Sequence, residues 1–264
     1  MALRVVSPGY GNQRPLVLVY KMGPEADATF VRALPSNVAI ANDTGPSMVG
    51  YYNTIPALSQ TISTLESELG ATFSPVIIAG FSEGGFATKR ILDLGGHPDA
   101  VVLADATYGT DLASWTTYAK AAEQGNGVFV ASHSSNVFME PSHPSPWRDL
   151  EKITGLTLPL GTGPGVSPRP ANAPAIAQPF ETVSGNVTVW SYPDLDHSAQ
   201  GAHVLPEILL PAAIESLGIA SSTKAPSILP KAILLLVGVG AVVLAAAEIL
   251  KSHGRGRLRY AHAR

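Results

Sequence analysis

Apolar residues along the chain gather in short runs of four or five, and stretches with helical spacing of apolar and polar positions separate them. Runs of this length, most of them flanked by Pro, Gly or polar residues, are typical of strands. They predict strands at residues 16–20, 38–41, 76–79, 101–104, 128–131 and 187–190. The stretches between them predict helices at residues 25–34, 56–69, 86–94, 112–123, 147–153 and 204–217.

The predicted strands are continuously apolar rather than alternating, which indicates a sheet that is covered on both faces. Strands that alternate with helices favour right-handed β–α–β units and parallel strand pairs. The sequence therefore predicts an α/β fold over residues 1–218, with a mostly parallel sheet flanked by helices. The chain has 264 residues, of which 45% are apolar, so it is long enough for one such domain and an extension.

Two regions interrupt the alternation. Residues 134–183 contain nine prolines and one short predicted helix, and they separate the fifth predicted strand from the sixth. A long excursion in a compact domain is usually functional or disordered, and both a substrate-covering lid and a partner-docking loop fit this one. Residues 219–230 are rich in Ser, Ala and Pro and are predicted to be a linker.

The linker leads into a hydrophobic segment that begins at Ala232, ends at Leu250 and contains one charged residue, Glu248. As a helix, the segment would rise about 28 Å, close to the thickness of the hydrocarbon core of a bilayer. Lysines flank it on both sides, and a basic tail at residues 252–264 follows. We therefore expect a C-terminal hydrophobic helix at residues 231–251 that spans a membrane as a single-pass anchor.

An Ala- and Gly-rich helix buried in an assembly, such as a homo-oligomer, is the alternative for this segment. The sidedness of an anchor stays open at this stage. The basic tail favours a cytoplasmic C-terminus, whereas the N-terminus has no apolar stretch typical of a secretory signal.

The composition excludes several kinds of site. There is no cysteine, so disulfides, thiolate catalysis and cysteine-based zinc sites are excluded. The chain has no H-E-x-x-H pattern, no Walker glycine loop and no convincing metal-ligand spacing, so we expect no metal and no cofactor. The net charge is −3 and the basic tail carries one aromatic residue, so we do not expect nucleic-acid binding.

The clearest motif is Gly80-Phe81-Ser82-Glu83-Gly84, a G-x-S-x-G pattern between a predicted buried strand and a predicted helix. In that context the chain must turn sharply, so that the serine hydroxyl stands above the sheet. Glycines at both ends of the motif remove side chains that would collide in the turn. Ser82 is therefore predicted to be a nucleophile, with the backbone N–H of Glu83 as an oxyanion donor.

On this motif and on the element order of residues 16–217, the chain resembles the α/β-hydrolase superfamily. The two segments at residues 80–85 and 99–109 also resemble small hydrolases of bacteriophages and bacteria. The resemblance implies a serine, an acid and a histidine in that order along the chain. His197 follows the last predicted strand and is expected to be the base, with His203 as the second candidate.

The resemblance implies that Asp105 is the acid. Asp105 directly follows the predicted strand at residues 101–104, which is the next strand after the one that precedes Ser82. The next strand ends without a carboxylate, and both Asp194 and Asp196 lie too near His197 in sequence to reach around its ring. Their expected role is to form the turn beside Pro193.

A second oxyanion donor is expected in the loop after the first predicted strand, from the backbone N–H of Lys21 or Met22, with Met22 preferred. Ser132 and His133 also reach the strand ends, where they could line a pocket, although a structural role suits His133 better.

These residues predict a serine hydrolase that cleaves an ester or an amide through an acyl-enzyme intermediate. A different class stays open, namely a structural protein, such as a component of a phage virion, whose hydrolase fold has lost its activity.

Overall fold

The computed structural model describes residues 3–22, 26–43, 45, 54–107, 111–134, 146–158, 180–192 and 195–219, which all belong to one compact unit. The strands are β1 (Arg4–Ser7), β2 (Gln13–Tyr20), β3 (Ala39–Asp43), β4 (Thr72–Phe81), β5 (Ala100–Ala104), β6 (Val128–Ser134), β7 (Phe180–Ser184) and β8 (Val187–Tyr192). The helices are α1 (Asp27–Ala33), α2 (Leu58–Leu69), α3 (Gly84–Asp93), α4 (Ala113–Glu123), α5 (Pro146–Thr154), α6 (His197–Ala199), the π-helix η3 (Gln200–Leu209) and α7 (Leu210–Ser216).

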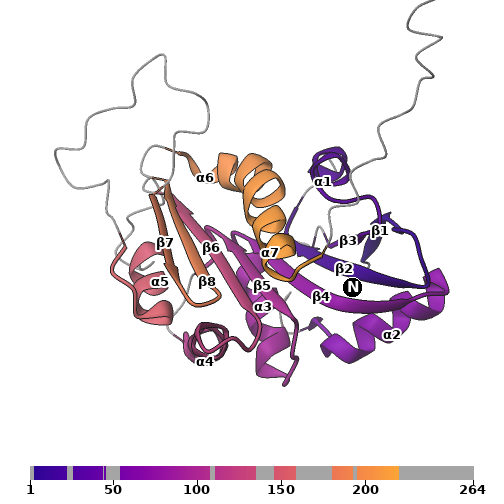
Figure 1. The fold of residues 1–264 in the computed structure, drawn as a ribbon, viewed down its shortest axis with the longest axis horizontal. Coiled ribbons are helices and arrows are strands. Elements are labelled where there is room, and N and C mark those ends of the chain that lie inside the picture. Colours follow the sequence, from indigo (N-terminus) through magenta and orange to yellow (C-terminus); the bar gives the residue numbers. More distant parts are fainter. Residues whose placement is uncertain are drawn as a thin grey trace, which may run out of the picture. The chain divides into compact units, whose positions relative to one another are not determined.

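The strands form one eight-stranded sheet in the order β1-β3-β2-β4-β5-β6-β8-β7 (Figure 1). The six central strands are parallel to their neighbours, whereas β1 and β7 pair antiparallel at the two edges. This arrangement is the mostly parallel, helix-flanked sheet of an α/β-hydrolase-like fold, as the sequence predicted.

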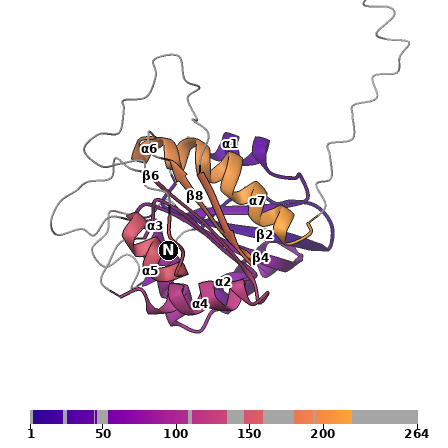
Figure 2. The same ribbon diagram turned by 60° about the vertical axis from the view of Figure 1, so that its left-hand side comes forward.

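Helices cover both faces of the sheet (Figures 1 and 2). On one face, α2, α3, α4 and α5 pack over one apolar cluster, and on the other α1, η3 and α7 pack over a second. Successive residues of β4 enter the two clusters in turn: Val76 and Ile78 face the first, and Ile77 and Ala79 the second. Because helices cover both faces of the sheet here, each of these four positions is apolar, which explains the continuous apolar runs in the sequence.

The edge strands β1 and β7 were not predicted from the sequence. Both are short, and neither shows a continuous apolar run, since an edge strand keeps one side near water. Val183 of β7, for example, is 57% exposed. The excursion predicted at residues 134–183 is therefore shorter at both ends, because β6 runs to Ser134 and β7 begins at Phe180.

The last helical region also differs from the prediction. It begins at His197 rather than at residue 204, and ten of its residues form a π-helix with Pro206 inside it. Proline removes a backbone donor and normally breaks an α-helix. π-Helical geometry is rare and is frequently found at functional sites. Because the helical region begins earlier than predicted, His197 is the first residue of a helix instead of a loop residue.

Several predicted segments lie outside the described residues. These are most of the proline-rich excursion, the linker after Ile219, the hydrophobic segment from Ala232 to Leu250 and the basic tail. Within the described ranges, no helix is both long enough and apolar enough to cross a membrane.

The order of the strands in the sheet indicates where a site is expected. After β2 the chain adds β3 on one side, and then β4 on the other, so the strand order reverses between β2 and β4. In open α/β sheets, ligands bind outside the carboxyl ends of the strands at such a reversal. The carboxyl ends of β2 and β4 carry Lys21 and Ser82.

Candidate active site

Ser82 occupies a sharp turn between β4, which ends at Phe81, and α3, which begins at Gly84. Its backbone has φ +51°, a left-handed conformation that non-glycine residues seldom adopt. Two glycines let this turn lie against its neighbours. A Cβ on Gly84 would lie 2.3 Å from the carbonyl oxygen of Tyr20, and one on Gly85 would lie 1.8 Å from that of Ala106. The turn therefore has the geometry of a nucleophile elbow.

The left-handed conformation recurs at the ends of the neighbouring strands. Among the described non-glycine residues, those with positive φ are Lys21 (71°), Ser82 (51°) and Asp105 (48°). Each follows a different parallel strand, namely β2, β4 and β5, at the carboxyl edge of the sheet. Backbone strain of this kind persists only where the surrounding structure enforces it, and it clusters at active sites.

Asp105 and His197 are in direct contact. The Nδ1 atom of His197 lies 2.8 Å from the Oδ2 atom of Asp105. Asp105 is fully buried, and Ser134 supplies two further donors to its carboxylate. The Ser134 hydroxyl donates to Oδ2 at 2.6 Å, and its backbone N–H donates to Oδ1 at 3.2 Å. A carboxylate held by three donors in a buried site is fixed in position and can orient the histidine ring.

His197 also contacts the elbow. Its ring stacks on Phe81, the residue before Ser82, with centroids 4.7 Å apart and an interplanar angle of 28°. Gly201 packs against the Phe81 ring, which leaves no room for a Cβ at that position. The imidazole is thus held beside the elbow by Asp105 and by an aromatic ring, and a quarter of its side chain remains exposed.

Two segments carry candidate backbone N–H donors for an oxyanion hole, namely the elbow and the loop after β2. Glu83 directly follows Ser82 and precedes the first turn of α3. In the loop after β2, the Lys21 N–H donates to the carbonyl of Asp43 at 2.8 Å, so of the two candidates in this loop Met22 is the better one. The Lys21 ammonium lies 3.0 Å from the Glu83 carboxylate and joins the two segments.

His203, the second candidate for the base, and the two aspartates expected to form the turn before His197 have other environments. His203 lies on η3, is about half exposed and sits 3.9 Å from Glu207. Asp196 caps α6, where its carboxylate accepts from the backbone N–H of Ala199 at 2.8 Å. Asp194 lies outside the described residues.

Ser132 and His133 are buried rather than exposed to a pocket. The Ser132 hydroxyl donates to the Gln200 side chain at 2.6 Å, and the Nε2 atom of His133 lies 2.8 Å from the Ser191 hydroxyl. Burial lowers the pKa of His133, which favours the neutral ring. These contacts fit structural roles.

Sequence reasoning missed Ser134, Phe81 as a partner of the histidine ring, and the ion pair between Lys21 and Glu83. Ser134 carried a weak signal, because it closely follows the predicted strand at residues 128–131, the next strand after the one that ends before Asp105. The other two contacts join segments far apart in the chain, and no motif marks them.

No group of three or more His, Asp or Glu side chains within the described part of the chain could hold a metal ion. The arrangement that the described residues do form is a serine on a strained elbow, a histidine that stacks on the residue before that serine, and a buried carboxylate that contacts the histidine and accepts two hydrogen bonds from Ser134.

No protein-family model matches the chain, and no curated protein matches it. Among solved structures it is similar to the Vlm2 thioesterase domain, at 12% identity and a TM-score of 0.39 over 81% of this chain and 96% of that one. TT1662 from Thermus thermophilus matches at 12% identity and a TM-score of 0.37, over 81% and 99% of the two chains.

A third similar structure is YbtT, a type II thioesterase from the yersiniabactin biosynthetic pathway, at 20% identity and a TM-score of 0.25. This match covers 42% of the present chain and about half, 51%, of YbtT. The likenesses are distant, so the assignment of the fold rests on the strand order, the parallel pairing and the elbow described above.

Proposed function

We propose that this chain is a serine hydrolase that cleaves a carboxylic ester, or a related acyl compound such as an amide, through an acyl-enzyme intermediate. One observation carries the proposal: the contact of 2.8 Å between His197 and the buried Asp105, on a ring that also stacks against the elbow of Ser82. A purely structural domain has no need of a strained serine beside a histidine–carboxylate pair.

In the proposed reaction, the Ser82 hydroxyl attacks the carbonyl carbon of the substrate while His197 takes its proton. Because Nδ1 of His197 contacts Asp105, Nε2 is the atom that exchanges protons. The backbone N–H groups of Glu83 and Met22 stabilise the negative oxygen of the tetrahedral intermediate. His197 then protonates the leaving group, which departs as the acyl-enzyme forms. In the second half, His197 takes a proton from a water molecule that attacks the acyl carbon, and it returns this proton to the Ser82 Oγ atom as the acid is released.

The first test is covalent labelling with a fluorophosphonate probe. Wild-type protein should be labelled and should hydrolyse p-nitrophenyl acetate, whereas Ser82→Ala should lose both, with a rate loss on the order of a million-fold. His197→Ala should be nearly as damaging. Thermal unfolding of each variant, followed by circular dichroism, controls for loss of the fold.

Labelling and turnover of folded Ser82→Ala at the wild-type rate would contradict the assignment of the nucleophile. Wild-type protein that is folded but neither labelled nor active would favour the structural class of protein instead. A panel of an ester, an acyl thioester and an anilide with the same acyl group would then separate the substrate classes for an active enzyme.

We also propose that residues 231–251 tether the domain to a membrane, on the basis of the uncharged run and the flanking lysines. A chain truncated after Ser221 should be soluble and as active as the full chain, which should require detergent or partition with membranes. Full-length protein that stays in solution without detergent, as a defined oligomer lost on truncation, would replace the anchor with an assembly helix.

A further inference from the structure

The ion pair between Lys21 and Glu83 joins the two segments that supply the proposed oxyanion donors. Lys21 lies in the loop after β2, and Glu83 lies in the elbow, with their charged atoms 3.0 Å apart. Met22 follows Lys21 directly, and Glu83 is itself the other donor residue. One partner of the pair, Lys21, is therefore covalently next to a proposed oxyanion donor, and the other, Glu83, is itself one.

The two segments touch closely at the backbone as well. A Cβ on Gly84 would meet the Tyr20 carbonyl and the Lys21 side chain, at 2.3 and 3.0 Å. Lys21 has φ +71°, and its N–H is held by the Asp43 carbonyl at 2.8 Å. Lys21 is thus held in a strained conformation by contacts at both its backbone and its ammonium group. Strain that the surrounding structure enforces in this way is typical of a functional position.

The charges also matter for the proposed chemistry. An unpaired carboxylate on Glu83 would oppose the negative charge that develops on the substrate oxygen nearby. The Lys21 and Glu83 side chains are 26% and 31% exposed, so water and salt screen their attraction only in part. Pairing with the Lys21 ammonium offsets the negative charge of the Glu83 carboxylate. The same pair ties the loop after β2 to the elbow.

We propose that Lys21 and Glu83 are positioning residues, whose ion pair sets the spacing between the Met22 and Glu83 N–H groups of the oxyanion hole. This inference rests on the proposed serine hydrolase function. It assigns to the Glu83 side chain a role separate from that of its backbone, and to Lys21 a role although it donates nothing to the substrate.

The test uses Lys21→Met, Glu83→Gln and the exchanged double variant Lys21→Glu/Glu83→Lys in the full chain. Small displacements of catalytic groups cost on the order of 10- to 100-fold in rate, so each single variant should lose about that factor in kcat. Its KM should change little, because the ground-state carbonyl depends less on the donors than the transition state does. The exchanged pair should recover most of the lost rate.

Arg32→Met is the matched control, since it removes an ion pair of similar length, 3.1 Å to Glu207, between α1 and η3. Its kcat should equal that of the wild type. Single variants with wild-type kcat would overturn the inference. So would an exchanged pair as slow as the single variants, or a Glu83→Gln variant faster than wild type, which would point to direct electrostatics instead of spacing.

Amide hydrogen exchange gives a readout that does not depend on activity. Glu83→Gln should speed exchange at the Lys21 and Met22 amides, and Arg32→Met should not. If the wild type proves inactive towards the probe, the proposed function fails, yet this measurement still decides whether the ion pair fixes the loop. Unchanged exchange at both amides would overturn the inference.

Discussion

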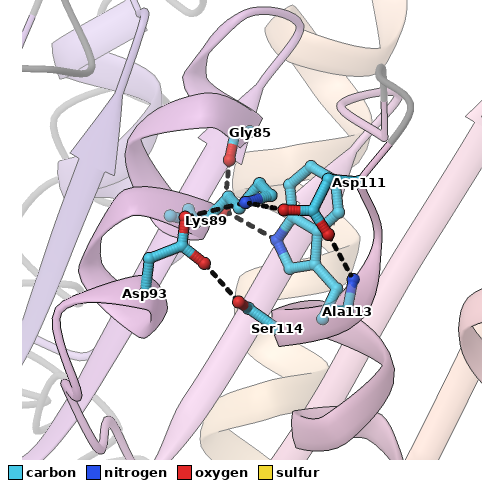
Figure 3. A network of polar contacts seen from close by, with 8 residues as sticks. Gly85, Lys89, Asp93, Asp111, Ala113 and Ser114 are labelled. Carbon is cyan, nitrogen blue, oxygen red and sulfur yellow. Dashed lines mark hydrogen bonds and ion pairs between the residues drawn. The ribbon is translucent and has the colours of Figure 1, made fainter.

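Asp105 and Lys89 each lie at the centre of a polar network, and the two networks are built from similar groups. Asp105 accepts from Ser134 and contacts His197, and it is completely buried at the carboxyl edge of the sheet. Lys89 of α3 pairs with Asp93 at 2.7 Å and Asp111 at 3.0 Å (Figure 3). The Asp111 side chain is 67% exposed, so water reaches the second network and not the centre of the first.

The second network connects α3 with the start of α4. Ser114 donates to Asp93, and Asp111 accepts from the backbone N–H of Ala113 (Figure 3). Burial works to lower the pKa of Lys89, but its hydrogen bonds to the two carboxylates outweigh this effect, so the pKa lies above its usual value. The same hydrogen bond from Lys89 lowers the pKa of Asp111.

The difference between the networks predicts different consequences of breaking them. Exposed ion pairs contribute little to stability, since water and salt compete for both partners. A buried carboxylate that loses a donor has no water to replace it, so each of its bonds has a large effect. We therefore expect the Asp105 network to control activity and stability, and the Lys89 network to control neither strongly.

Of the variants that compare the two networks, Asp105→Asn should cause the largest loss of activity. Asparagine tolerates the left-handed backbone at this position, so the fold should persist. The amide holds the histidine ring in the wrong tautomer, which costs on the order of 10⁴-fold in kcat. Steady-state kinetics with p-nitrophenyl acetate measures it, and a folded variant within tenfold of wild type would exclude Asp105 as the partner of His197.

An intermediate effect is expected from Ser134→Ala, which removes the hydroxyl donor but keeps the backbone N–H bond to Asp105. Because hydrogen bonds to charged groups contribute about 1.5–3 kcal/mol, the free energy of unfolding should fall by that amount. The rate should fall as well, since the carboxylate is less firmly held.

Ser132→Ala is the control for Ser134→Ala, because it removes a hydroxyl from the same strand that bonds the neutral Gln200. It should cost about 1 kcal/mol and leave kcat unchanged. Urea unfolding and steady-state kinetics of both variants make the comparison. Equal rate losses in the two would show that Ser134 has no specific effect through Asp105.

The smallest effect is expected from Lys89→Met. Removing an ammonium that serves two partly exposed carboxylates should cost about 1 kcal/mol or less, and less still at high salt. Urea unfolding at low and high salt concentration measures this loss, and kcat should not change. A large loss of activity would instead show that the Lys89 network positions α3 and the elbow that precedes it.

The sequence predicted the structure well where local rules apply. The G-x-S-x-G motif predicts an elbow because a strand that turns sharply into a helix needs glycine at its tightest contacts, and Gly84 does lie against the Tyr20 carbonyl. The apolar runs predicted the six central strands, because a sheet that helices cover on both faces favours apolar residues at successive positions. The chain order then put Asp105 and His197 at the same edge of that sheet.

Other features depended on contacts that no local pattern encodes. The edge strands β1 and β7 became strands by pairing with β3 and β8, although their own sequences are weakly apolar. The left-handed backbones at Lys21 and Asp105 could not be predicted, because non-glycine residues seldom adopt this conformation and only the surrounding packing enforces it.

What the sequence determined by itself was the alternation of the six central strands with helices, the covered sheet and the serine at the elbow, since these follow from spacing and residue type within short segments. Only the tertiary structure decided which groups meet: Ser134 with Asp105, Phe81 with His197, and Lys21 with Glu83. Each of these pairs joins different segments of the chain, so its geometry is set by the register and packing of the whole sheet rather than by any local preference.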